Sequence, residues 1–94
     1  MITRVVRMHF RPEAEQAFIR IFRSAEPHIR SFKGCRTLGI FKEKGNQCVY
    51  FTISEWDSAS DLEDYRQSPL FSTTWTSTKA LFGGPPLAWT LEKQ

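Results

Sequence analysis

The chain has 94 residues, of which 40% are hydrophobic and 14% aromatic, and it carries a formal net charge of +3. This length predicts a single domain, residues 1–94, with a thin core, and the hydrophobic share argues against disorder. No apolar run approaches the roughly 20 residues that cross a bilayer, and no signal-peptide pattern begins the chain, so we expect a cytoplasmic protein without a membrane span, in which Cys35 and Cys48 stay reduced.

The N-terminal third predicts a strand followed by a helix. Ile2–Phe10 reads as a strand without Gly or Pro, and Pro12 suits the first turn of a helix. Pro27 should kink that helix, or break it into two parts, and Gly34 should end it. The apolar stripe of the helix has i, i+3, i+4 spacing and consists of Ala14, Ala17, Phe18, Ile21, Phe22, Ala25, Ile29 and Phe32.

A β-hairpin follows, with strands Cys35–Lys42 and Gln47–Glu55 joined by a turn at residues 43–46. If Lys42 lies opposite Gln47, one face of the hairpin is wholly aliphatic and aromatic. We expect the helices to cover this face, which carries Leu38, Ile40, Val49, Phe51 and Ile53.

Large apolar side chains then recur at helical spacing from Leu62 to Phe82. Ser58 caps a short helix over residues 59–66, in a pattern that resembles a capping box. Ser68 caps a second helix, with Pro69 at its first position.

Leu87–Leu91 is predicted to be the last strand, with Leu87, Trp89 and Leu91 pointing toward the helices. The resulting order, β-α-β-β-α-β, predicts an α+β, ferredoxin-like fold in which an antiparallel sheet carries helices on one face. The other face is too uncharged for a solvated sheet, and we expect a second copy to cover it. Its predicted members are Thr3, Val5, Arg7, His9, Thr37, Phe41, Tyr50, Thr52, Ser54 and Thr90.

Two other classes of protein with this fold do not match the sequence. The third strand lacks the motif with which RNA-binding members stack bases, and the basic residues are scattered along the chain, so we expect no nucleic-acid partner. No Cys-x-x-Cys motif and no His/Cys cluster at zinc spacing is present, so we expect no metal site.

Several strings resemble the antibiotic biosynthesis monooxygenase (ABM) family: Phe32–Cys35, Phe51–Trp56, Leu62–Phe71 with the helical residues after it, and Pro86–Thr90. The resemblance implies a homodimer, a dimeric α/β barrel, with a small pocket between helices and sheet in each subunit. Known members oxidise quinols or anthrones with molecular oxygen and without metal or flavin; others degrade haem, and many have no established activity.

The haem-degrading branch can be compared residue by residue. Its members use an Asn on the first strand, a Trp before the Ser of the second helical region and a His further along. In this chain Asn46 lies in the hairpin turn, Tyr65 stands at the Trp position and Trp75 at the His position. The comparison therefore argues against haem degradation.

The helical region supplies candidate walls for a pocket. Tyr65, Phe71 and Trp75, with Trp89 from the last strand, are the expected flat walls, although aromatic stripes more often fill a core. Tyr65 and Trp75 favour the pocket, because each carries a polar hydrogen that needs a partner when buried.

Candidates for proton transfer and charge stabilisation are fewer. His28 or His9 is the candidate proton acceptor, although a helix-end position for the first and an interface hydrogen bond for the second are the simpler interpretations. Arg66 or Lys79 could steady a phenolate, or could be surface groups that cover the rings.

The resemblance therefore implies a monooxygenase that needs no cofactor and acts on a small hydroxylated aromatic ligand. A binding or structural homodimer without chemistry of its own is the alternative, and haem degradation is a lesser one.

Overall fold

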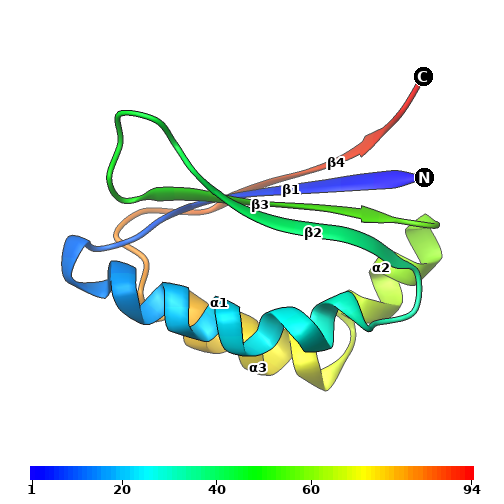
Figure 1. Cartoon of the computed structure of the whole chain (residues 1–94), viewed down its shortest axis with the longest axis horizontal. Helices are drawn as coiled ribbons and strands as arrows, with labels where there is room; N and C mark the ends of the chain where they lie inside the picture. The colour runs from blue at the N-terminus through cyan, green and yellow to red at the C-terminus, as the bar shows by residue number, and fades with distance from the viewer.

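The computed structural model describes residues 1–94 and contains four strands and three α-helices in two layers (Figure 1). The sheet is antiparallel throughout, in the order β2-β3-β1-β4, and the helices lie on one of its faces. The α+β, ferredoxin-like fold is therefore confirmed. The elements are β1 (Ile2–His9), a 3-10 turn η1 (Pro12–Ala14), α1 (Glu15–Arg30), β2 (Cys35–Lys42), β3 (Val49–Trp56), α2 (Ala59–Arg66), α3 (Pro69–Lys79) and β4 (Leu87–Glu92).

The starts of α2 and α3 are where the sequence predicted them. The Ser58 hydroxyl accepts a hydrogen bond from the backbone N–H of Asp61 at 3.1 Å, and Ser68 accepts one from Phe71 N–H at 3.1 Å. Each bond satisfies a backbone donor that a helix leaves free at its N-terminus. None of the helices combines the length and apolar character that a bilayer crossing requires.

Of the two outcomes predicted at Pro27, a kink or a break, the break is wrong, because α1 continues through Pro27 to Arg30. Pro27 lies in the last turn, where its carbonyl accepts hydrogen bonds from the backbone N–H and the hydroxyl of Ser31. The helix thus ends before Gly34, which has a φ of 86° and turns the chain into β2.

The predicted register of the hairpin is also wrong. Lys42 lies opposite Tyr50 instead of Gln47, a displacement of three residues. Because side chains alternate along a strand, an odd displacement exchanges the two faces of β3. Tyr50, Thr52 and Ser54 therefore face the helices, and Phe51 and Ile53 face the other side.

A contact with α1 accounts for this register. Tyr50 is 6% exposed, and its hydroxyl donates a hydrogen bond to the Glu15 carboxylate at 2.7 Å. Lys42 also pairs with Glu15, at 3.1 Å. The buried phenol thus has a charged acceptor on the helix layer, and residues 43–48 form a longer connection than the predicted turn.

The side chains of the last strand face the opposite sides of the sheet from those predicted. Ala88 lies opposite Val6, which faces the helices, and Trp89 lies opposite Val5, which faces away. The prediction that Leu87, Trp89 and Leu91 point toward the helices is therefore wrong. These three side chains are 50%, 43% and 50% exposed.

We call the side of the sheet away from the helices the outer sheet face. It is more apolar than predicted, because Phe51, Ile53 and the odd-numbered residues of β4 replace Tyr50, Thr52, Ser54 and Thr90. From the pairing, its members are Thr3, Val5, Arg7, Thr37, Gly39, Phe41, Phe51, Ile53, Glu55, Leu87, Trp89 and Leu91.

The core lies between the sheet and the helices, in two clusters. In the larger cluster Phe10 and Phe18 stack with ring centroids 4.2 Å apart. The smaller cluster consists of Ile2, Trp56 and Leu62. Both clusters contribute side chains to one cavity.

Candidate functional site

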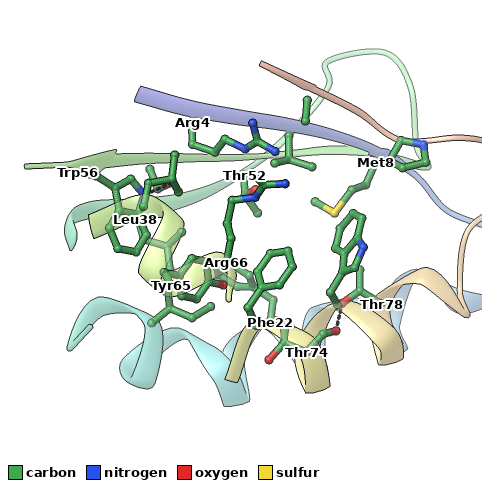
Figure 2. Close-up of a pocket in the computed structure, with 18 of the residues that line it drawn as sticks. Arg4, Met8, Phe22, Leu38, Thr52, Trp56, Tyr65, Arg66, Thr74 and Thr78 are labelled. Carbon is green, nitrogen blue, oxygen red and sulfur yellow. Dashed lines mark hydrogen bonds between the residues drawn. The ribbon is translucent and has the colours of Figure 1, made fainter. Parts of the chain in front are cut away.

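A cavity of about 260 Å³ lies between the sheet and the helices, and 12 of its 19 lining residues are hydrophobic (Figure 2). Its inner part is formed by buried side chains: Met8, Phe18, Phe22, Leu38, Trp56 and Leu62. Arg66, Pro86 and Ala88 also line it and are exposed, so they mark its entrance. The cavity thus runs from solvent into the core.

An array of aromatic rings forms one wall. The ring of Tyr65 meets the ring of Phe71 edge-on, with centroids 5.3 Å apart. Phe71 in turn stacks on Trp75, with centroids 6.0 Å apart and planes inclined by 19°. The structure thus brings together three of the predicted pocket residues at this cavity.

Ser68 fixes the geometry of this wall at the junction of α2 and α3. Its hydroxyl donates a hydrogen bond to the carbonyl of Tyr65 at 2.6 Å and accepts one from the N–H of Phe71 at 3.1 Å. The helical stripe is interrupted here, so the two rings approach one another across the junction.

Two polar hydrogens in this wall have no partner within the chain. Neither the Tyr65 hydroxyl nor the Trp75 indole N–H makes a hydrogen bond to protein, and no fully buried side-chain N or O atom lacks a partner. Both atoms therefore keep some accessible surface, through which they can donate to water or to a ligand. Burial raises the pKa of Tyr65 to about 12, with a smaller contribution from the Cys35 thiol, so this phenol stays protonated at neutral pH.

Two other polar groups of the lining are paired within the chain. The Thr78 hydroxyl donates to the carbonyl of Thr74 at 2.7 Å (Figure 2). The Trp56 indole N–H donates to the Ser54 hydroxyl at 3.0 Å.

Two arginines supply the only charges in the lining. Arg4 lies on β1 and donates a hydrogen bond to the Thr90 hydroxyl at 2.7 Å. Burial lowers the pKa of Arg4, and the nearby positive charge of Arg66 lowers it further. The sequence analysis missed Arg4. Its spacing of two and four residues from Val6 and Met8 places it on the same face of β1, and this could have indicated that it lies beneath the helices.

Four predicted site residues are not brought to the cavity. His28 is exposed on α1, and Lys79 is exposed at the end of α3. His9 is exposed at the end of β1 beside Gly84, and Trp89 lies on the outer sheet face. None of the four lines the cavity.

The lining contains no His, Asp, Glu, Lys or Cys. No group of three or more His, Cys, Asp or Glu side chains is placed to hold a metal ion. The cavity offers an apolar space beside flat rings, neutral hydrogen-bonding groups from tyrosine, tryptophan and threonine side chains, and two guanidinium groups. These features suit a planar ligand that carries oxygen atoms.

A family model described as antibiotic biosynthesis monooxygenase matches residues 1–76. The structure is similar to that of a conserved protein from Methanosarcina mazei Go1, with 20% identity, coverage of 100% of this chain and 94% of that one, and a TM-score of 0.94. A solved antibiotic biosynthesis monooxygenase has 15% identity, coverage of 100% and 99%, and a TM-score of 0.93. Rv0793 from Mycobacterium tuberculosis has 18% identity, coverage of 99% and 94%, and a TM-score of 0.91. No curated protein matches the chain.

Proposed function

The chain belongs to the antibiotic biosynthesis monooxygenase family, and on that premise we propose that it oxidises a small hydroxylated aromatic of the quinol or anthrone type with molecular oxygen, without a cofactor. The observation that carries the proposal is the cavity of about 260 Å³ beside Tyr65, Phe71 and Trp75. An engineered apolar cavity of about 150 Å³ binds benzene, so this one has room for a substituted ring.

The reaction requires few catalytic groups from the protein. For an anthrone, the ring methylene loses two hydrogens and gains one oxygen atom from O2, and the other oxygen atom leaves as water. The substrate first loses a proton, then gives an electron to O2, and the two radicals combine. The protein must hold the ring, exclude water and stabilise the substrate oxyanion.

The cavity residues divide these tasks. The rings of Phe71 and Trp75 hold the flat substrate, and the Tyr65 hydroxyl and the Trp75 N–H donate hydrogen bonds to its oxygen. Hydrogen bonds from these two donors favour the ionised oxygen, so they lower the pKa of a bound phenol. The released proton passes to water at the entrance, because no side chain of the lining is a base at neutral pH.

We also propose that the protein is a homodimer that buries the outer sheet face. Phe41, Leu87 and Leu91 are each at least half exposed there, and Trp89 is 43% exposed. Soluble monomers rarely expose several large apolar side chains together on one face. His9 would then lie at the rim of the interface instead of in the catalytic cavity.

Oxygen uptake by metal-free protein with a panel of quinols and anthrones tests the activity. Trp75→Ala and Tyr65→Phe should reduce uptake by about tenfold or more, because an oriented donor in a dry site contributes this much. Thr73→Ala, on the exposed side of α3, is the matched control. Uptake that both cavity variants leave unchanged would rule out this cavity as the site.

A non-catalytic, small-molecule-binding or structural homodimer remains the second candidate. It is favoured by one observation, the lack of a base among the lining residues. Ligand binding without oxygen consumption across the whole panel would establish it. Haem degradation is a lesser alternative, since no histidine lines the cavity. A shift of the Soret band when haem is added to the protein would support this activity.

A further inference from the structure

Arg4 and Arg66 bring two positive charges together at the open side of the cavity. Figure 2 shows both side chains extending into the space between the two layers, Arg4 from the sheet and Arg66 from the helices. They are close enough for the charge of Arg66 to lower the pKa of Arg4. Two like charges in a partly buried place repel one another, so the free protein carries an unfavourable interaction that a bound anion would relieve.

Neither arginine is neutralised inside the cavity. The only hydrogen bond of the Arg4 side chain goes to a neutral hydroxyl, that of Thr90, and the charge of Glu63 affects the pKa of Arg4 less than the charge of Arg66 does. Arg66 pairs with Glu63 at 3.3 Å, and the Glu63 side chain is 53% exposed. A solvated pair of this kind is weak. Arg11, Arg23, Arg30 and Arg36 also pair with carboxylates, but none of them lines the cavity.

We infer that Arg4 and Arg66 form a subsite for a carboxylate, and that the ligand of this cavity is a hydroxylated aromatic carboxylate. This inference rests on the proposed function and narrows its substrate class. With Glu63, the three charges sum to one positive charge, which one carboxylate balances. A guanidinium presents paired donors that match the two oxygens of a carboxylate.

The subsite also fixes the orientation of the ligand. The carboxylate lies at the entrance, between β1 and the end of α2, where it keeps contact with water. The ring then extends inward along Phe71 and Trp75, among buried side chains that offer no charge. The phenolic oxygen of the ring meets the free donors of Tyr65 and Trp75.

A matched set of ligands tests the inference on the unaltered protein: gentisate (a dihydroxybenzoate), its methyl ester and hydroquinone. Isothermal titration calorimetry should show that gentisate binds about tenfold more tightly than the other two, because hydrogen bonds to a charged group are the stronger ones. The difference should shrink as salt concentration rises. Equal affinities, or no binding of gentisate at millimolar concentration, would overturn the inference.

Arg4→Gln and Arg66→Gln should each lower the ratio of gentisate to hydroquinone affinity about tenfold. Arg20→Gln removes an exposed charge from α1 and should leave the ratio unchanged. If an arginine variant fails to fold, the comparison of the three ligands on the unaltered protein still tests whether the cavity prefers a carboxylate.

The two proposals fail separately. A preference for gentisate without any oxygen uptake would support the subsite and overturn the oxygenase. Uptake with hydroquinone but no preference for the carboxylate would overturn the subsite alone.

Discussion

The indole ring of Trp56 stacks on the phenol ring of Tyr65, with centroids 5.1 Å apart and planes inclined by 23°. Trp56 ends β3 and is fully buried, whereas Tyr65 belongs to α2 and lines the cavity. Tyr65 then meets Phe71 at the start of α3. The buried indole therefore sets the orientation of the aromatic wall from the sheet side.

Ser54→Ala should lower the free energy of unfolding by about 1–3 kcal/mol, because it leaves the buried indole N–H of Trp56 without its acceptor. Urea unfolding measures the loss. Ser24→Ala on the exposed side of α1 is the control. A loss no larger than that of the control would show that the indole finds another acceptor.

Gly34→Ala should destabilise the protein by about 2–4 kcal/mol, because φ is positive there and the new Cβ would lie 2.4 Å from the Cβ of Asp61. Gly45→Ala has a similar φ of 82° with open space around it, so it should cost only about 1–2 kcal/mol. The difference between the two variants in thermal unfolding measures the clash alone. Equal losses would mean that Asp61 moves aside freely.

Ser68→Ala should lower stability by about 0.5–2 kcal/mol through the lost cap of α3. It should also weaken ligand binding, since the same hydroxyl joins the backbones of Tyr65 and Phe71. Ser72→Ala, one turn further along α3 and exposed, should be neutral or slightly stabilising. Unchanged ligand affinity in Ser68→Ala would show that the wall keeps its geometry without the cap.

Stability should fall as the pH rises from about 10 to about 12. The pKa of Tyr65 is raised from 10.0 to about 12 by burial, so in this range the unfolded chain releases the phenolic proton while the folded chain keeps it. The unfolded state then binds fewer protons, and the free energy of unfolding drops by up to roughly 2–3 kcal/mol.

Tyr65→Phe should remove this share of the alkaline loss in urea unfolding curves measured across the pH range. The pKa of Tyr50 is also raised to about 12, by burial and then by its hydrogen bond to Glu15, so part of the loss should persist. An identical pH profile for the variant and the unaltered protein would contradict the assignment to Tyr65.

Trp89→Glu should convert the proposed dimer into a monomer, because it places a charge on the outer sheet face at a side chain that is 43% exposed in the single subunit. Gel filtration at micromolar concentration measures the change, and Thr73→Glu on α3 is the control. A monomeric profile of the unaltered protein would contradict the dimer itself.

Local signals in the sequence predicted the elements and their order. The capping serines Ser58 and Ser68 mark helix starts through bonds that span only three residues, so the prediction needed no tertiary information. The aromatic wall was predicted for the same reason, since helical spacing places Phe71 and Trp75 on one side of α3.

The faces of β3 and β4 could not be predicted in this way. Alternation separates two sets of residues but does not say which set faces the helices. Phe51, Ile53 and Trp89 have the composition of a core set, yet they lie on the outer sheet face, while Thr52 and Ser54 line the cavity. A sheet that is apolar on both sides removes the contrast on which the prediction depended.

Strand β4 follows α3 through residues 80–86, and its alternate side chains belong to two different surfaces. Ala88 borders the cavity entrance, whereas Leu87 and Trp89 border the outer sheet face. A slip of β4 by one residue against β1 would exchange the two sets and spoil both surfaces at once, whereas a slip of two would preserve both. The pairing of β4 with β1 therefore maintains the cavity entrance and the outer sheet face together.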